Sequence, residues 1–232
     1  MIRAVQESVA KIEHYPDVRC EALREAISRF EQVNMEEILC GNGAAELFFA
    51  AVQAVWPQKA LVIAPSFSEY EEALRSVGAE VEYYYLCEED NFQIREDYVD
   101  KLSEEIDMIF LCNPNNPTGQ TIDRDMLIKI LDRCKKQNIV VILDECFLEF
   151  LDEPNRYEMS DLRGEYPNLL IIKAFTKIFS MPGLRLGYAI SSNQDILEEM
   201  SWKLQQWNVS VPAQMAGVAA LEKPKEYIRQ TR

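Results

Sequence analysis

Short apolar runs alternate along the chain with longer stretches in which apolar residues recur every three or four positions. The apolar runs are candidate strands at 38–40, 61–64, 81–86, 108–112, 139–143, 169–172 and 187–190. Several of them, such as IVVIL at 139–143, are apolar at consecutive positions, which is typical of parallel strands covered on both faces. The alternation of strands and helices predicts an α/β fold with a doubly wound, mostly parallel sheet.

The helical stretches between these strands differ in how much of their surface is apolar. In 126–134 and in 23–30 the apolar residues follow the spacing of one buried helix face. The stretch Ala44–Val55 (AAELFFAAVQAV) is apolar almost all round, so we expect this helix to be deeply buried.

The composition is that of a folded protein with an acidic surface. The chain has 232 residues, of which 48% are hydrophobic and 27% charged, enough for one large α/β domain and part of a second. Its formal net charge of −15 argues against a nucleic acid or an anionic membrane as a partner, because both would repel it. No apolar run reaches the length of about 18 residues that spans a membrane, and residues 1–20 lack an apolar signal core. The sequence therefore predicts a cytoplasmic protein.

Cysteine and histidine usage excludes several kinds of site. None of the six cysteines belongs to a C-x-x-C pair, which argues against a zinc site or a dithiol redox motif. His14 is the single histidine, which removes Ser-His-Asp, Cys-His and histidine-rich metal chemistry. We therefore predict no metal site.

The first candidate binding segment is the glycine-containing turn at 41–46 (GNGAAE), which joins a short strand to the apolar helix. Glycines let a backbone approach a ligand, and free N–H groups at the start of a helix bind anions. A nicotinamide-dinucleotide loop is disfavoured, since Glu46 stands where the third glycine belongs and no acidic residue ends the next strand. The motif is not a Walker A loop either, and on its own it is equally compatible with a plain tight turn.

Two further polar segments follow apolar strands. Asp144 closes the run IVVILD, where a carboxylate could be a Walker B acid, a metal ligand, a counter-ion to a cationic ring nitrogen, or simply a helix N-cap. A Walker B acid is excluded because the chain has no Walker A loop. A metal ligand is disfavoured because no histidine or cluster of acids lies nearby. The segment 113–119 (NPNNPTG) combines two turn-fixing prolines with asparagine amides, which favours a binding loop over an ordinary turn.

The fourth segment places Lys177 after an apolar strand and among the apolar residues Phe175, Ile178 and Phe179. Apolar surroundings and a nearby cation lower the pKa of a lysine and make its amine nucleophilic. Arg185, eight residues further on, is a candidate for that cation and for a phosphate ligand.

Along the chain the turn at 41–46 is followed by the loop at 113–119, by Asp144 and by the segment from Lys177 to Arg185, each at a strand end. Together they resemble the class I/II aminotransferases, which bind pyridoxal 5′-phosphate (PLP) and have PLP fold type I. The resemblance covers essentially the whole chain. It implies a three-layer α/β/α large domain at 31–221, preceded by a helical segment at 1–30 and followed at 222–232 by the start of a small domain.

The resemblance also implies roles for the residues that contact the cofactor ring. Lys177 matches the lysine that forms the Schiff base with PLP and, once freed by substrate, moves the proton at the substrate Cα. Asp144 matches the aspartate that keeps the ring nitrogen protonated. Asn116 matches the asparagine that bonds the ring 3′ oxygen, and Phe67 the aromatic residue that stacks on the ring.

Other matches concern the cofactor phosphate. Ala44 and Ala45 match residues whose backbone N–H groups hold it, and Thr176 and Arg185 match its hydroxyl and guanidinium ligands. Tyr15 matches a tyrosine that reaches the phosphate of the neighbouring subunit, which implies a homodimer with shared active sites.

The sequence departs from the family pattern at two positions near the cofactor. Phe147 stands where many relatives have a tyrosine that bonds the 3′ oxygen, so one hydrogen bond to PLP is expected to be lost. Ala174 stands where several relatives have a serine or threonine. Within the family, strings such as PSFSEY, NPNNPTGQ and DECFLEF resemble histidinol-phosphate aminotransferases and the related threonine-phosphate decarboxylases.

Three functions follow as hypotheses. The first is a PLP-dependent aminotransferase that acts on an amino acid or a phosphorylated amine such as histidinol phosphate. The second is an amino-acid decarboxylase of the threonine-phosphate decarboxylase type. Because family members are longer at both ends, we expect the arginine that grips the substrate carboxylate to be missing here. The third hypothesis is therefore a truncated, inactive PLP-binding paralogue.

Overall fold

A seven-stranded sheet runs through the centre of the molecule in the order β1-β7-β6-β5-β4-β2-β3. The computed structural model describes residues 1–232. Only β7 is antiparallel to its neighbours, β6 and β1. The strands are β1 Ile38–Gly41, β2 Lys59–Ala64, β3 Glu80–Tyr85, β4 Met108–Cys112, β5 Val140–Asp144, β6 Leu169–Ala174 and β7 Gly187–Ile190. The predicted mostly parallel α/β sheet is confirmed, and each predicted strand falls within two residues of an observed one.

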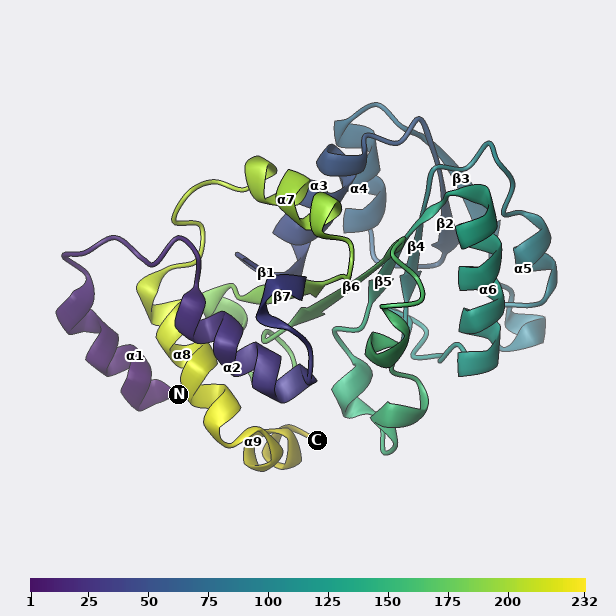
Figure 1. The fold of residues 1–232 in the computed structure, drawn as a ribbon. Helices are drawn as coiled ribbons and strands as arrows, with labels where there is room; N and C mark the ends of the chain where they lie inside the picture. Colours follow the sequence, from purple (N-terminus) through teal and green to yellow (C-terminus); the bar gives the residue numbers. More distant parts are fainter.

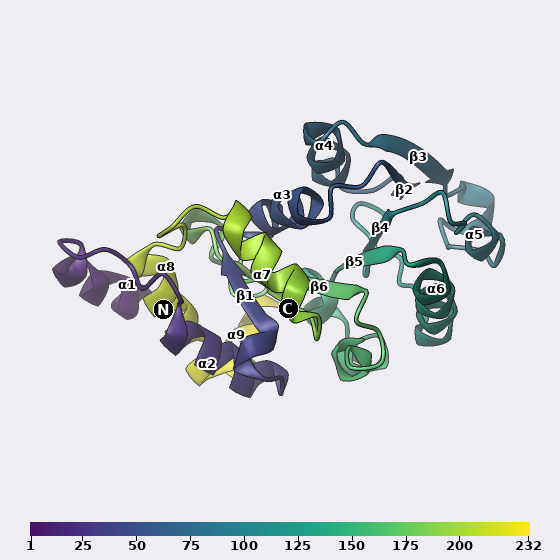
Figure 2. The same ribbon diagram turned by 45° about the horizontal axis from the view of Figure 1, so that its top comes forward.

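Helices cover both faces of the sheet (Figure 1). They are α1 Ile2–Ser8, α2 Glu21–Glu31, α3 Ala44–Val55, α4 Glu69–Ser76, α5 Asp97–Asp100, α6 Arg124–Gln137, α7 Gln194–Lys203, α8 Val211–Glu222 and α9 Pro224–Thr231. Figure 2 shows α3 and α4 on one side of the strands and α6 on the other.

Alternate residues along the strands feed two separate hydrophobic cores. One core joins α3, α4 and α7 to strand residues such as Val62, Phe110 and Ile142. The other joins α2, α6 and α8 to the opposite face, through residues such as Ile109 and Val141. This two-sided burial explains why the central strands are apolar at consecutive positions.

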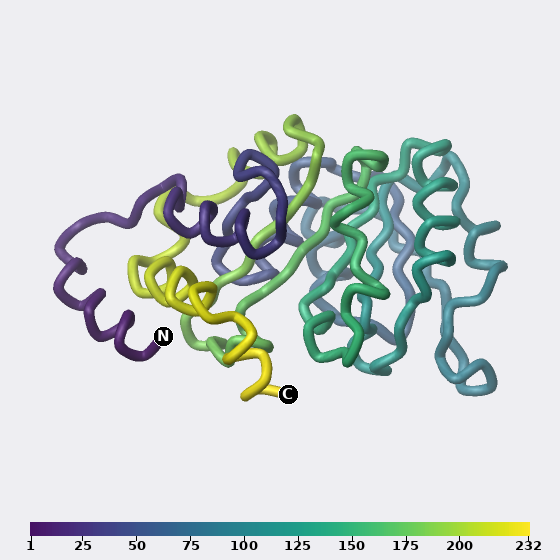
Figure 3. The backbone as a smooth tube through the Cα atoms, turned by 60° about the horizontal axis from the view of Figure 1, so that its bottom comes forward, coloured from purple at the N-terminus to yellow at the C-terminus, as the bar shows by residue number.

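The N-terminal and C-terminal segments lie side by side at one end of the molecule (Figure 3). The amino group of Met1 donates to the Tyr227 hydroxyl at 3.2 Å, and α2 and α8 share the core on their face of the sheet. The domain boundaries expected near residues 30 and 221 stay a prediction.

None of the helices has both the length and the apolar composition that a membrane-spanning segment requires.

The sheet order brings the candidate segments to one edge. Strands β1, β2, β4, β5 and β6 run in the same direction, so the loops that follow them emerge on the same side. Because β7 runs the other way, the residues just before it also reach this side. This carboxyl edge is where α/β sheets bind ligands.

Candidate active site

An anion-binding turn lies where β1 passes into α3. Gly43, the residue before the helix, has a φ of 89°, and a Cβ built on it would lie 2.6 Å from Nη2 of Arg185. The guanidinium therefore lies directly against the turn, beside the free N–H groups of Ala44 and Ala45. Arg185 makes a long hydrogen bond to the Pro182 carbonyl, at 3.4 Å, and no ion pair with a carboxylate. A guanidinium and a helix N-terminus at one place form an anion site.

Glu46 fixes the shape of this turn. One oxygen of its carboxylate accepts hydrogen bonds from the Asn42 backbone N–H and from Nδ2 of Asn208, both at 2.6 Å. Glu46, which disfavoured a dinucleotide loop in the sequence, thus connects the turn to the segment before α8 through these two hydrogen bonds.

Asp144 lies at the centre of the edge, as the last residue of β5 and only 4% exposed. Its carboxylate accepts the Tyr70 hydroxyl at 2.5 Å and the Cys146 backbone N–H at 2.9 Å. Burial raises the pKa of Asp144, and the bonds from Cys146 and Tyr70 and the positive charge of Lys177 oppose that shift. Lys177 is thus one of the groups that influence the charge of this carboxylate.

Lys177 follows β6 and faces the same region. Its Nζ lies 5.6 Å from the centroid of the Phe147 ring. The neighbours Phe175, Ile178 and Phe179 are buried, whereas the Lys177 side chain is exposed. These three residues therefore do not supply the apolar surroundings expected for the amine, because they are buried in the core while Lys177 is exposed.

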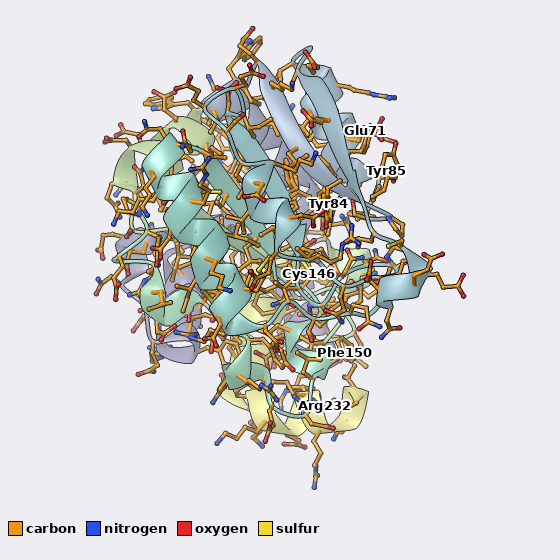
Figure 4. All side chains as sticks on the ribbon, turned by 90° about the vertical axis from the view of Figure 1, so that its right-hand side faces the viewer. Glu71, Tyr84, Tyr85, Cys146, Phe150 and Arg232 are labelled. Atoms are coloured by element: carbon orange, nitrogen blue, oxygen red, sulfur yellow. The ribbon has the colours of Figure 1, made fainter.

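The loops after β4 and β5 line an open cavity of about 290 Å³ that includes Phe147, whose ring Lys177 approaches. It is lined by Pro114, Asn115, Asn116, Pro117, Gly119, Phe147, Phe150 and Leu151. In Figure 4 the labels of Cys146 and Phe150 mark the segment that follows β5. Asn116 thus lines the same cavity as the aromatic side chains of Phe147 and Phe150.

The remaining predicted residues lie as follows. Phe67 is half-buried after β2, with its ring edge-to-face against Tyr70 at 5.7 Å. Thr176 is half-buried next to Lys177. Tyr15 is 77% exposed and stacks on Trp207 at a centroid distance of 4.5 Å, so within this chain it contacts the segment before α8.

Two residues of the site escaped the analysis of the sequence. Tyr70 was not assigned, although it lies one helical turn after Phe67, a spacing that places both side chains on the same side of a helix. Gly187 was not assigned either. A Cβ on it would lie 2.8 Å from the backbone nitrogen of Ala44, so only glycine lets β7 approach the anion-binding turn this closely.

Comparison with known proteins identifies the family. The chain matches the family model "Aminotransferase class I and II" over residues 2–232 and belongs to that family. It is 36% identical over 220 residues to threonine-phosphate decarboxylase of Salmonella typhimurium, covering 95% of this chain and 60% of that protein. It is 37% identical to histidinol-phosphate aminotransferase of Desulfitobacterium hafniense, covering 100% of this chain and 64% of that protein.

Solved structures agree with this assignment. The histidinol-phosphate aminotransferase of Clostridium acetobutylicum superposes with a TM-score of 0.89 at 31% identity, covering 99% of this chain and 68% of that one. The L-threonine-O-3-phosphate decarboxylase of Porphyromonas gingivalis gives 0.84 at 26% identity, covering 98% and 67%. The chain thus spans about 60% of the length of the curated relatives it matches.

PLP is the cofactor of this family, and the residues at the carboxyl edge fit it. The anion-binding turn with Arg185 suits a phosphate. The buried, hydrogen-bonded Asp144 suits a cationic ring nitrogen, and the exposed Lys177 amine suits an aldehyde. The site thus offers a different partner to each of three groups of PLP: the phosphate, the ring nitrogen and the aldehyde.

Proposed function

We propose that this chain is the cofactor-binding part of a PLP-dependent aminotransferase that acts on a phosphorylated amine or amino acid. The observation that carries the proposal is that Asp144, a buried carboxylate, and the exposed amine of Lys177 both lie at the carboxyl edge of the sheet. A strand-end carboxylate, an amine and an anion site at one edge suit the ring nitrogen, the aldehyde and the phosphate of PLP.

Bound PLP would supply a ring that accepts electrons from the substrate Cα. In the proposed arrangement the N–H groups of Ala44 and Ala45 and the Arg185 guanidinium hold its phosphate, together with the Thr176 hydroxyl. These groups fix one end of the cofactor.

Other residues act on the ring end of the cofactor. Asp144 would hold a proton on the ring nitrogen, Asn116 would donate to the 3′ oxygen, and Phe67 would pack against the ring. Lys177 would hold the aldehyde end of the cofactor, and its amine is the base that would move a proton at the substrate Cα. Phe147 contributes no hydroxyl, so the Asn116 amide is the side-chain donor proposed for the 3′ oxygen.

The substrate is proposed to carry a phosphate. Both groups of relatives are named for phosphorylated substrates, histidinol phosphate and threonine phosphate. An anionic substrate must overcome the repulsion of a chain with a formal net charge of −15, so cations beside the cavity are needed to bind it.

Trapping the cofactor on Lys177 tests the proposal. The chain is incubated with PLP, reduced with borohydride and digested, and mass spectrometry is expected to find the pyridoxyl group on the peptide that contains Lys177. In Lys177→Ala the label and the absorbance of the lysine-bound cofactor are expected to disappear, because the proposed Schiff-base amine is removed. Lys203→Ala, which removes an exposed lysine of α7, serves as the matched control and should retain both. Label spread evenly over the surface lysines would contradict the proposal.

Decarboxylation is the second candidate, because the chain is 36% identical to a threonine-phosphate decarboxylase over 95% of its length. Incubation of the PLP-loaded protein with L-threonine O-3-phosphate separates the two activities. Release of CO₂ identifies a decarboxylase, whereas conversion of the cofactor to its amine form with an amino donor identifies an aminotransferase. Cofactor attachment without either reaction identifies an inactive PLP-binding protein.

A second copy of the chain is the proposed partner. Tyr15 is 77% exposed and its neighbour Trp207 43%, and Ile2, Val9 and Ile12 are also exposed in the same N-terminal segment. Such an apolar surface is typical of a protein–protein interface. We propose that a second copy of this chain covers this surface, so that Tyr15 reaches the cofactor phosphate bound to that copy.

A cytoplasmic location stays a prediction.

Sedimentation tests the dimer. We expect a mass of twice 26.8 kDa. Tyr15→Phe should retain that mass but bind PLP roughly tenfold more weakly, because one hydrogen bond to the phosphate is lost. Tyr85→Phe, which alters a 72% exposed tyrosine of the edge strand β3, should change neither. A monomer with full PLP affinity would contradict the shared site.

A further inference from the structure

Tyr70 is completely buried in the first turn of α4, yet its hydroxyl reaches the carboxyl edge of the sheet. There it donates a hydrogen bond to Oδ2 of Asp144 at 2.5 Å. Burial raises the pKa of Tyr70, so the hydroxyl keeps its proton and remains a donor. None of the proposed cofactor contacts uses this residue.

Three aromatic rings fix the direction of the Tyr70 hydroxyl. Phe110 stacks on the Tyr70 ring at 4.9 Å with an interplanar angle of 17°. Phe48 and Phe67 contact it edge-to-face, at 5.0 Å and 5.7 Å. A ring held from three sides has little freedom to turn, so its hydroxyl points at Asp144 before any ligand binds.

Burial opposes the negative charge of Asp144 and raises its pKa. The thiols of Cys112 on β4 and Cys146 after β5 lie close to it, and burial raises the pKa of both thiols, so they stay neutral. Hydrogen bonds from Cys146 and from Tyr70, together with the positive charge of Lys177, offset the loss of water around the carboxylate. Of these groups, Tyr70 is the one that reaches Asp144 from another element, α4.

We propose that Tyr70 is a positioning residue that keeps Asp144 ionised and aimed at the ring nitrogen of the cofactor. The inference rests on the proposed function, since it takes Asp144 as the partner of that nitrogen. A hydrogen bond to a charged group is among the stronger ones in proteins, and here it comes from a preorganised donor. Tyr70 thereby favours the state in which the carboxylate is charged and the ring nitrogen carries the proton.

A pair of matched substitutions tests this role in the cofactor-free chain. Tyr70→Phe removes only the hydroxyl and keeps the ring packing. Tyr98→Phe is the control, because Tyr98 is also completely buried but its hydroxyl has no hydrogen-bond partner. Tyr98→Phe is therefore expected to leave the melting temperature unchanged or slightly higher.

The two variants should differ in their pH dependence. Burial already raises the pKa of folded Asp144, so stability falls as pH rises from the unfolded to the folded pKa. Without the Tyr70 bond the folded pKa rises further and this fall is larger. Relative to Tyr98→Phe, Tyr70→Phe should melt roughly 5 °C lower at pH 8, and the deficit should shrink towards pH 5. A deficit that is the same at both pH values would reveal a packing role and overturn the inference.

A second measurement uses the chain loaded with ¹⁵N-labelled PLP. The chemical shift of the ring nitrogen should report a protonated ring in wild type and in Tyr98→Phe, and a less protonated ring in Tyr70→Phe. Equal shifts in all three proteins would overturn the role of Tyr70. If wild type itself fails to attach PLP at Lys177, the proposed function fails instead, so the two failures are distinguishable.

Discussion

Replacing Asp144 with asparagine is expected to stabilise the fold and to slow proton transfer at the substrate Cα. Burial raises the pKa of Asp144, which means that the charged form lowers folding stability at neutral and higher pH. Asparagine has the same shape and no charge, and its carbonyl can still accept the Cys146 N–H. The melting temperature should rise by about 3 °C at pH 8, with a gain that shrinks as pH falls and the wild-type carboxyl takes up its proton.

The same substitution should slow proton transfer at the substrate Cα by roughly 10²–10³-fold, because a fixed charge that stabilises the reacting state is lost. Deuterium exchange at the Cα of an amino donor measures this rate in the PLP-loaded protein. Asp125→Asn, at an exposed position of α6, is the control and should change neither stability nor rate. An Asp144→Asn protein that is both less stable and fully active would show that the carboxylate has a structural role only.

The strands were predictable because nearly every central strand residue is buried. Continuous apolar runs arise where helices cover both faces, and both cores of this structure draw on the same strands. The position of Asp144 followed from the same pattern, since a polar residue that ends such a run lies at an edge of the sheet. The predicted end of this strand was one residue too early, because Asp144 itself is paired with Cys112 and Ile172 in the sheet.

The contacts between segments were not predictable from local sequence. Arg185 touches Gly43 only because β7 inserts antiparallel between β1 and β6, an arrangement that no local periodicity specifies. The bond from Tyr70 to Asp144 likewise depends on how α4 packs on β4 and β5. Both contacts bridge residues more than 70 positions apart.

A buried ionic cluster is the clearest feature that the sequence concealed. In the run LLIIKA the apolar pattern predicts a strand, and Lys173 within it looks like an ordinary charge. In the structure Lys173 is 5% exposed, and its Nζ lies 2.7 Å from Glu31, 3.2 Å from Glu158 and 3.5 Å from Glu145. The three acids come from the end of α2 and from two loops, so only the tertiary fold assembles them.

Lys173 neutralises an otherwise acidic interior. Burial alone would lower the pKa of Lys173, but the carboxylates outweigh it and raise that pKa. Burial raises the pKa of Glu145 to about 8, although the charge of Lys173 opposes the shift. Oε2 of Glu145 has no hydrogen-bond partner, and Glu31 is bonded by the Tyr188 hydroxyl. The cluster therefore depends on a single cation.

Glu145→Gln should match wild type at acid pH, where the carboxyl group is protonated in both the folded and the unfolded chain. Burial raises the folded pKa of Glu145 from 4.5 to about 8, so the wild-type carboxyl lowers stability progressively as pH rises through that window. The glutamine variant should lack this loss and already be the more stable protein at pH 7. It serves as the control for removal of the cation itself.

Lys173→Met is expected to destabilise the chain by about 3–5 kcal/mol at pH 8, because it leaves buried carboxylates without their counter-ion. That is a large part of the total stability of about 5–15 kcal/mol that a protein of this kind has. The deficit should shrink as pH falls towards 5, since Glu145, whose pKa burial raises to about 8, then takes up a proton and no longer needs the cation. Urea unfolding followed by circular dichroism at both pH values measures the difference. A Lys173→Met protein as stable as wild type at pH 8 would mean that water reaches the cluster, because only solvent could then stabilise its charges.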